Sequence, residues 1–412
     1  MTQSDVCDPG SVKEAKLPRH DWVLLPLLSL LTICAIAIPT ELIARRSLSG
    51  SGREAMCHPV LNDPATGPRV IPNSVCWEKI PEGPWVEFRF NSCGHRAGME
   101  CGPKPPGTYR IVMVGSSVVL GQRVQREKTI AALLPEELSQ DTGRRIELYN
   151  EGMFSEHPRI VAEHFHEFLG AKPDMILWLL SPYDLKAVSF LCEGCDNTWE
   201  LPASAAKAGT LARAWYRIKV DLANDRLMTE LWQRMGFSPE DDPAGILLRH
   251  FFYTSQGQTV KSYLMAPDDE AGFLKAEPSA EWKSRLRQFD TYSAGIEVLA
   301  KAADVPLVVT FMPNRAQAAM ISMGEWPAGY NPYKLGDELR SIVTSHGGIY
   351  IDILPYFSNI PNPEKYYFPV DGHPDANGHA MIAEMLAKAL TGGAVPALKV
   401  EAQPQAAQEQ GR

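Results

Sequence analysis

The chain has 412 residues, of which 45% are hydrophobic and 22% are charged. This length exceeds that of an average domain and can bury a full core, so we expect one large domain with appended segments. The formal net charge is −9 and no Lys/Arg-rich run is present. A nucleic-acid partner is therefore not expected, because such proteins need a basic surface to neutralise phosphates.

The N-terminal region contains an apolar run, residues 22–39, without a charged residue. The run approaches the length that a helix needs to cross a bilayer, and charged residues flank it on both sides. We therefore expect residues 1–21 to be a cytoplasmic N-terminus and residues 22–43 to be a single-pass transmembrane anchor. A cleaved signal peptide ending near Ala35-Ile36-Ala37 is the alternative, but both the run and the segment before it are long for one.

Cysteines are concentrated after this run. Six of the eight follow it: Cys57, Cys76, Cys93, Cys101, Cys192 and Cys195. Their crowding favours disulfide bonds in an oxidising compartment, which predicts a body on the periplasmic side of the inner (cytoplasmic) membrane, with the pairing left open. The alternative is a zinc site formed by Cys192 and Cys195 with Cys93 and Cys101, although paired CxxC motifs would be expected there and only one is present.

The remaining chain divides by composition. Residues 44–106 are rich in Pro, Gly and Cys, with alternating pieces such as residues 85–90, and predict a small β lead-in stapled by disulfides. Residues 107–392 alternate between apolar runs and helical periods. Strands are expected over residues 109–114, 146–149, 175–180, 306–312 and 349–353, and helices over 130–138, 157–169, 295–303, 334–346 and 374–390. This alternation predicts an α/β fold, a flavodoxin-like three-layer α/β/α domain with a five-stranded parallel sheet.

Two segments depart from that alternation. Residues of about 186–290 are mostly helical in pattern, with expected helices over 211–228 and 247–264, and we interpret them as an insertion between the third and fourth strands. Such an insertion can roof an active site or form a packed accessory subdomain, and the pattern does not separate the two. Residues 393–412 lack an apolar period and are expected to be a disordered tail.

A serine follows the first strand of the domain. The sequence Val114-Gly115-Ser116-Ser117 places Ser117 just beyond the carboxyl end of that strand. Ligands of open parallel sheets bind outside the carboxyl ends of strands, so Ser117 is a candidate nucleophile. Ser and Gly also populate turns for steric reasons, and this motif alone is weak.

The partner of such a serine lies near the other end of the chain. Asp371-Gly372-His373-Pro374 precedes the last expected helix. A serine hydroxyl becomes nucleophilic when a histidine held by a carboxylate takes its proton, which assigns His373 as base and Asp371 as its support. Asp371 and Pro374 could also simply start the helix. His379 falls within the helical run and is interpreted as structural.

A hydrolytic serine needs backbone or side-chain donors for the oxyanion. Candidates follow the second and third strands: Gly152 in Asn150-Glu151-Gly152, and Tyr183 in Ser181-Pro182-Tyr183-Asp184.

Together these blocks resemble the SGNH, or GDSL-like, hydrolases. The resemblance covers about residues 108–392, includes Gly121-Gln122-Arg123-Val124, and extends to Asn91-Ser92-Cys93-Gly94-His95-Arg96, which is similar to a lead-in of membrane-anchored bacterial members. It implies Ser117 as nucleophile, His373 and Asp371 as its activating pair, and an oxyanion hole containing the N–H groups of Ser117 and Gly152. It implies no metal or organic cofactor.

Three positions depart from the family pattern. Ser116 stands where Asp is usual. The Asp-to-His spacing is two and not three, as in proteins that acetylate exported polysaccharides such as alginate. Tyr183 replaces the asparagine that usually donates to the oxyanion.

The resemblance therefore implies an extracytoplasmic serine esterase acting on a small-molecule or glycan ester, for example O-acetyl groups of envelope carbohydrate. The alternatives are an O-acyltransferase for an exported polysaccharide and a non-catalytic glycan-binding relic of the fold, the latter because of Tyr183.

Overall fold

The computed structural model describes residues 20–48, 60–63, 67–80, 82–154, 156–187, 255–266 and 269–400. Several predictions fall elsewhere. Most of the predicted N-terminal segment, the helix over 211–228, Cys192, Cys195 and the end of the tail lie outside the described residues.

A parallel sheet forms the centre of the molecule. Its strands are β5 (Thr108–Val114), β6 (Arg145–Asn150), β7 (Met175–Leu180), β8 (Leu307–Phe311) and β9 (Ile349–Ile351). Their order is β6-β5-β7-β8-β9 and every neighbouring pair is parallel. Every residue of β5, β7 and β8 is buried, as expected for strands covered on both faces. The predicted five-stranded parallel sheet is confirmed.

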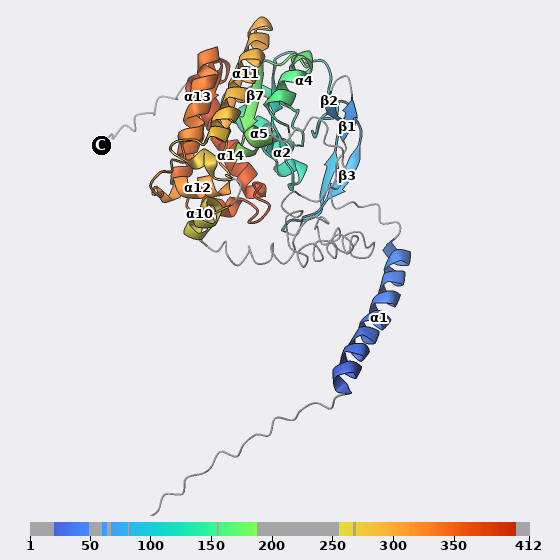
Figure 1. Ribbon diagram of the computed structural model, residues 1–412. Coiled ribbons are helices and arrows are strands. Elements are labelled where there is room, and N and C mark those ends of the chain that lie inside the picture. The colour runs from blue at the N-terminus through green and yellow to red at the C-terminus, as the bar shows by residue number, and fades with distance from the viewer. Residues whose placement is uncertain are drawn as a thin grey trace, which may run out of the picture.

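Helices cover both faces of this sheet (Figure 1). The chain moves from β5 outward to β6 and then back across to β7, β8 and β9. Because parallel crossovers are right-handed, that reversal places the connecting helices on opposite faces. Accordingly, α3 (Ile130–Thr142) packs with α14 (Ala376–Ala389), whereas α4 (Pro158–Gly170) and α13 (Lys334–His346) pack with α11 (Ala280–Ala302).

The insertion is shorter than predicted at its C-terminal side. Helix α11 begins at Ala280, where the Ser279 side chain accepts the Trp282 N–H, and it buries Trp282, Leu286 and Phe289. Residues 280–290 therefore belong to the domain core. Helix α10 (Gln256–Leu264) coincides with the end of the helix predicted over 247–264. Helix α12 (Arg315–Met323) and the short α5 (Pro182–Ala187) were not predicted.

The lead-in consists of two antiparallel hairpins, formed by β1 (Val60–Asp63) with β2 (Gly67–Val70) and β3 (Val75–Glu78) with β4 (Val86–Arg89). Phe88, Phe90 and Leu120 share a small core of their own, which joins the lead-in to the domain.

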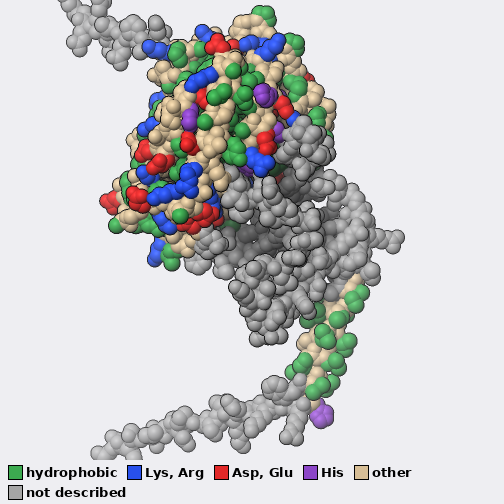
Figure 2. Space-filling view, turned by 45° about the horizontal axis from the view of Figure 1, so that its top comes forward, with side chains coloured by type: hydrophobic (Ala, Val, Ile, Leu, Met, Phe, Trp, Pro, Cys, Tyr) green, Lys and Arg blue, Asp and Glu red, His purple; other side chains and the backbone are tan. Residues whose placement is uncertain are grey.

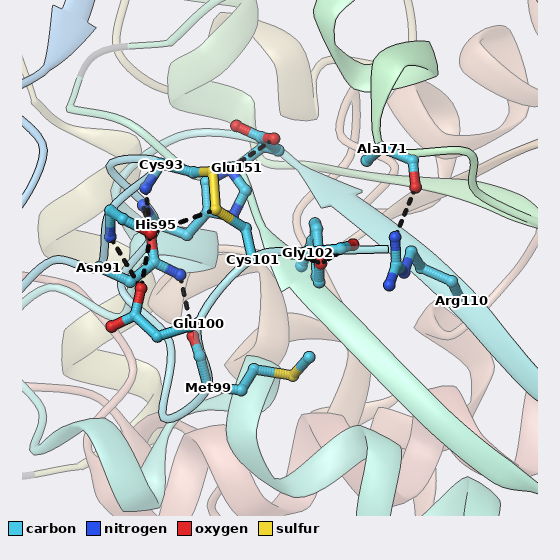
Figure 3. Close-up of a disulfide and its surroundings, with 12 residues drawn as sticks. Asn91, Cys93, His95, Met99, Glu100, Cys101, Gly102, Arg110, Glu151 and Ala171 are labelled. Carbon is cyan, nitrogen blue, oxygen red and sulfur yellow. Dashed lines mark hydrogen bonds and ion pairs between the residues drawn. A yellow bond between two sulfur atoms is a disulfide. The ribbon is translucent and has the colours of Figure 1, made fainter. Parts of the chain in front are cut away.

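A disulfide joins Cys93 to Cys101, and Cys76 is also disulfide-bonded. The alternative zinc site is therefore wrong, because two of its four proposed thiolates are consumed by this bond. Figure 3 shows the disulfide beside His95 and Glu151, whose side chains meet at 2.7 Å.

The N-terminal apolar run forms helix α1 (Asp21–Leu48), which projects from the α/β body (Figure 1). Its side chains between Val23 and Ile36 are exposed, and the hydrophobic ones line the projecting helix in Figure 2. Among the helices in the described part of the chain, none is long and apolar enough to cross a membrane.

The C-terminal tail begins later than predicted. Residues 393–400 continue past α14 through two short helical turns, Leu390–Ala394 and Pro396–Leu398. Val395 and Leu398 are buried against the domain core, so these residues are part of the fold.

Candidate active site

The turn after β5 presents Ser117. Gly115 has a φ of +147°, and a Cβ there would lie 2.5 Å from the Leu179 carbonyl oxygen and 2.7 Å from Val119 Cγ2. Only glycine fits this close passage between strand and helix. The chain then enters the short helix α2 (Ser117–Leu120), which ends at Gly121 in the left-handed region. Ser117 is thus the first helical residue beyond the carboxyl end of a central strand.

Ser117, His373 and Asp371 form a continuous hydrogen-bonded chain. Ser117 Oγ lies 2.7 Å from His373 Nε2, across 256 positions of sequence. His373 Nδ1 lies 2.7 Å from Asp371 Oδ1. An acceptor carboxylate at Nδ1 favours the tautomer that carries its proton there, which leaves Nε2 free to accept the serine proton.

A tight loop carries both the base and its carboxylate. The Phe368 N–H donates to the His373 carbonyl at 2.9 Å, and the Gly372 N–H donates to the Phe368 carbonyl at 2.9 Å. Gly372 has a φ of +85°, which favours glycine between the two functional residues. Immediately afterwards, the Asp375 side chain accepts the Gly378 N–H and caps α14. The loop is therefore closed on itself and rests on a helix.

Asp371 stays ionised although it is largely buried. Burial by itself would raise the pKa of Asp371, but attraction to His373, its hydrogen bond to His373, and Arg123 together hold that pKa well below its ordinary value. Arg123 Nε donates to Asp371 Oδ2 at 3.0 Å. The sequence did not indicate Arg123 as a site residue, because nothing local links it to a position 248 residues later.

A cavity of about 370 Å³ opens beside the nucleophile. Its wall combines the functional groups with apolar surface, and includes Ser117, Asp371, His373, Tyr183, Phe154, Met312 and Tyr367. Tyr183, in the first turn of α5, is 48% exposed there. A Cβ at Gly372 would lie 3.8 Å from its hydroxyl, so the Tyr183 hydroxyl lies beside the catalytic loop.

Gly152 is placed differently from the other predicted residues. Its N–H donates to Asn150 Oδ1 at 2.9 Å, and the cavity wall beside Ser117 does not include it among the described residues. A Cβ at Gly152 would lie 2.3 Å from the Leu120 nitrogen. The glycine is thus required for close packing against α2, and its predicted N–H contribution to the oxyanion hole would need that hydrogen bond to open.

Two buried carboxyl groups, those of Asp184 and Glu156, hold the turn between β5 and α2. Asp184 Oδ2 accepts the Ser181 N–H at 2.6 Å and also bonds the Ser116 side chain, while burial raises the pKa of Asp184 to about 6. Glu156 Oε2 accepts the Gly115 N–H at 3.3 Å, and burial raises the pKa of Glu156 well above its ordinary value. These bonds fix the two residues that precede Ser117 and the start of α5. Ser116 therefore has a structural partner.

His379 is fully buried away from the cavity. Its Nδ1 accepts the Ile130 N–H at 3.2 Å and so joins α14 to the start of α3. Burial lowers the pKa of His379 to about 3, which keeps the imidazole neutral. The structural interpretation of His379 agrees with this position.

The site thus brings a serine, a histidine and a carboxylate together at the carboxyl edge of the sheet, in the order in which serine hydrolases use them. No protein-family model matches the chain, and no curated protein matches its sequence. Among solved structures, the chain is similar to the acetyl xylan esterase Axe2 from Geobacillus stearothermophilus, at 9% identity and a TM-score of 0.36 over 72% of this chain and 97% of that one.

Two further solved structures are similar. One is a lipase/acylhydrolase from Enterococcus faecalis, at 11% identity and a TM-score of 0.33 over 72% of this chain and 100% of the other. The other is the psychrotrophic esterase EstA from Pseudoalteromonas sp., at 10% identity and a TM-score of 0.32 over 68% and 96% of the two chains. Because these similarities are distant, they carry no functional argument, and the function has to be inferred from the geometry of the site.

Proposed function

We propose that this protein is a serine esterase of the SGNH (GDSL-like) type. The observation that carries the proposal is the chain Ser117–His373–Asp371, with both of its hydrogen bonds at 2.7 Å. A serine held by a histidine, and that histidine held by a buried carboxylate, is an arrangement suited to acyl transfer.

The reaction proceeds in two halves. His373 Nε2 takes the Ser117 proton while Oγ attacks the ester carbonyl, and the resulting imidazolium then gives this proton to the departing alkoxide. The acyl group remains on Ser117. His373 deprotonates a water that attacks the acyl carbonyl, and the imidazolium then returns this proton to Ser117 Oγ as it leaves, which releases the acid and restores the free serine. Asp371 stabilises the imidazolium in both halves.

The oxyanion is held by donors around the cavity. The N–H of Ser117, as the first residue of α2, is not needed for hydrogen bonds within the helix and can donate to the oxyanion. The Tyr183 hydroxyl is proposed as a second donor because it lies beside the catalytic loop and lines the cavity. It would take the place of the amide donor that the family pattern has at this position.

The proposed substrates are esters with small acyl groups, including O-acetyl groups of envelope carbohydrate. The cavity of about 370 Å³ accommodates a short acyl chain, and exposed Tyr183 offers an aromatic face to a sugar. An extracytoplasmic location is proposed on the basis of the Cys93–Cys101 disulfide, since such bonds persist in oxidising compartments. Attachment to the inner membrane through residues 22–43 stays a prediction, which cell fractionation of the full chain against a chain lacking residues 1–48 would test.

The experiment compares hydrolysis of p-nitrophenyl acetate by the purified protein and by Ser117→Ala. We expect kcat to fall by about 10⁴-fold or more, because the nucleophile acts as a unit with its base. Equal rates for the two proteins would leave the fold as a non-catalytic relic. Adding a sugar acceptor distinguishes the alternative, an acyltransferase, through acetylated sugar detected by mass spectrometry.

A further inference from the structure

The β lead-in touches the loop that carries the catalytic pair. The Glu82 carboxylate accepts the Val370 N–H at 2.9 and 3.2 Å and the Asp371 N–H at 2.8 Å. A Cβ at Gly83 would lie 3.6 Å from the Phe368 ring. One carboxylate from the lead-in therefore holds two successive backbone amides of the catalytic loop, one of them that of Asp371 itself.

A second lead-in carboxylate reaches Asp371 through Arg123. Glu78, at the end of β3, is 1% exposed. Its carboxylate pairs with Arg123 Nη1 and accepts a hydrogen bond from Gln122 Nε2 at 2.8 Å. Arg123 in turn donates to Asp371 Oδ2 at 3.0 Å. The Arg123 side chain is only 11% exposed and that of Asp371 15%. Glu78, Arg123, Asp371 and His373 thus form one row of largely buried charged and ionisable groups.

The lead-in also holds the nucleophile side of the site. Arg96, which lies between Cys93 and Cys101 in the sequence and is buried, donates through Nη1 to the Leu120 carbonyl at 3.0 Å and through Nη2 to the Val124 carbonyl at 2.7 Å. These carbonyls lie at and beyond the end of α2, the helix that begins with Ser117. Contacts from the lead-in therefore hold both the helix that begins with Ser117 and the loop that carries Asp371 and His373.

The alternation of charge in the row has a chemical consequence. A lone Arg123 beside Asp371 would neutralise the carboxylate and weaken its support of a developing imidazolium. Glu78 offsets the arginine, so Arg123 can orient Asp371 Oδ2 without removing its charge. Interactions of this kind are strong because the groups are screened little by water.

We infer that the lead-in is part of the catalytic apparatus, with Glu82 and Glu78 as positioning residues that set the place and the effective charge of Asp371. This inference rests on the proposed esterase function. A purely structural lead-in would affect stability, but it would leave the turnover of folded protein and its pH dependence unchanged.

The central test concerns Glu82. Glu82→Gln keeps the shape of the side chain but weakens the hydrogen bonds that it accepts from the Val370 and Asp371 N–H groups. Glu82→Asp keeps the charge on a shorter side chain. We expect kcat to fall by about tenfold or more in Glu82→Gln, with KM within about twofold, because displacing a catalytic group by a fraction of an ångström affects the transition state most. Glu82→Asp should recover part of the loss. The matched control is Glu87→Gln at a partly exposed position of β4, where the carboxylate bonds Arg89 and no other side chain of the described residues.

The second test uses the sign of the charge. Glu78→Gln leaves Arg123 uncompensated and disfavours the imidazolium, so the acidic limb of the kcat/KM profile should move to lower pH by about half a unit to one unit. Arg123→Gln removes the cation and should move that limb the other way. Other titratable groups near the catalytic pair are unchanged in both variants. They are Glu82 on the Asp371 N–H, Tyr183, Asp184 and Glu156 in the cavity wall, and the buried His379, which interacts electrostatically with His373.

The outcomes distinguish failure of the esterase proposal from failure of the role proposed for the lead-in. Phosphonylation of Ser117 by a fluorophosphonate, followed by intact mass, reports the activated serine without a natural substrate. If the wild type is not labelled and Ser117→Ala hydrolyses p-nitrophenyl acetate equally fast, the esterase proposal itself fails. If the wild type is labelled but folded Glu82→Gln and Glu82→Asp match Glu87→Gln in kcat, labelling rate and pH profile, only the role of the lead-in is overturned. Shifts of the same sign in Glu78→Gln and Arg123→Gln would likewise contradict it.

Discussion

Oδ1 of Asp371 lies 2.7 Å from Nδ1 of His373 and also 3.3 Å from the His373 backbone nitrogen. The carboxylate therefore fixes both the ring and the main chain of the base. A neutral amide in its place would present either an oxygen or an NH₂ group to Nδ1, and it would no longer stabilise the imidazolium.

Asp371→Asn should lower kcat by about 10³- to 10⁴-fold while the protein remains folded, because the imidazole loses its preferred tautomer and its electrostatic support. Steady-state kinetics with p-nitrophenyl acetate measures this. Asp375→Asn is the matched control, since Asp375 caps α14 through a side-chain oxygen that asparagine also has. A comparable loss of kcat in both variants would contradict the assigned role.

Tyr183→Phe removes one hydroxyl from the cavity wall. If that hydroxyl donates to the oxyanion, kcat should fall by about 10²-fold with little change in KM, as expected for a donor used mainly in the transition state. Unchanged kcat would instead assign the oxyanion to backbone donors alone.

Gly115→Ala should destabilise the fold and impair turnover. Its Cβ would meet the Leu179 carbonyl oxygen at 2.5 Å, and φ is +147°. We expect the free energy of unfolding to fall by at least about 2 kcal/mol, measured by denaturant titration. Gly143→Ala isolates the backbone contribution: φ is +67° there, and nothing lies within 4 Å of an added Cβ. This variant should lose about 1 kcal/mol and retain activity.

His379→Gln should alter the acid sensitivity of stability. The pKa of folded His379 is lowered to about 3 from an ordinary value of 6.5, so the unfolded chain binds the extra proton between those two pH values. The stabilising contribution of the neutral ring is complete above pH 6.5 and is lost as pH falls towards 3, at up to about 1.4 kcal/mol per pH unit. Glutamine keeps an acceptor for the Ile130 N–H but does not titrate. Unfolding free energies measured from pH 7 to 4 should therefore decline less steeply in the variant, and parallel curves would refute the linkage.

Most of the sheet could be predicted from the sequence, because β5, β7 and β8 are buried along their whole length and therefore consist of nearly unbroken apolar runs. Helix α12 escaped prediction for a related reason. All of its residues from Arg315 to Ile321 are buried, including Arg315 and Gln317, so it has no polar face to mark a helical period.

The meeting of Ser117, His373 and Asp371 could be predicted because the sequence marks each of them locally. Ser117 directly follows a strand, and Asp371 and His373 lie in one short motif. Arg123, Glu78 and Glu82 reach Asp371 only after the chain has folded, and their surroundings in sequence resemble those of ordinary surface charges. Gly152 shows the converse: a glycine in the expected place whose tight packing on Leu120 explains it without catalysis.

The closed loop of residues 368–373 carries the base and its carboxylate together. Because neither residue depends on a distant segment to meet the other, the loop forms one structural unit, which could be transferred to another scaffold in one piece. Its docking against the Ser117 turn has to be preserved, together with its contacts to Glu82 and Arg123. The connection between β7 and β8 can therefore lengthen or diversify over evolution without separating the acid, the base and the nucleophile, provided that its ends stay at the sheet.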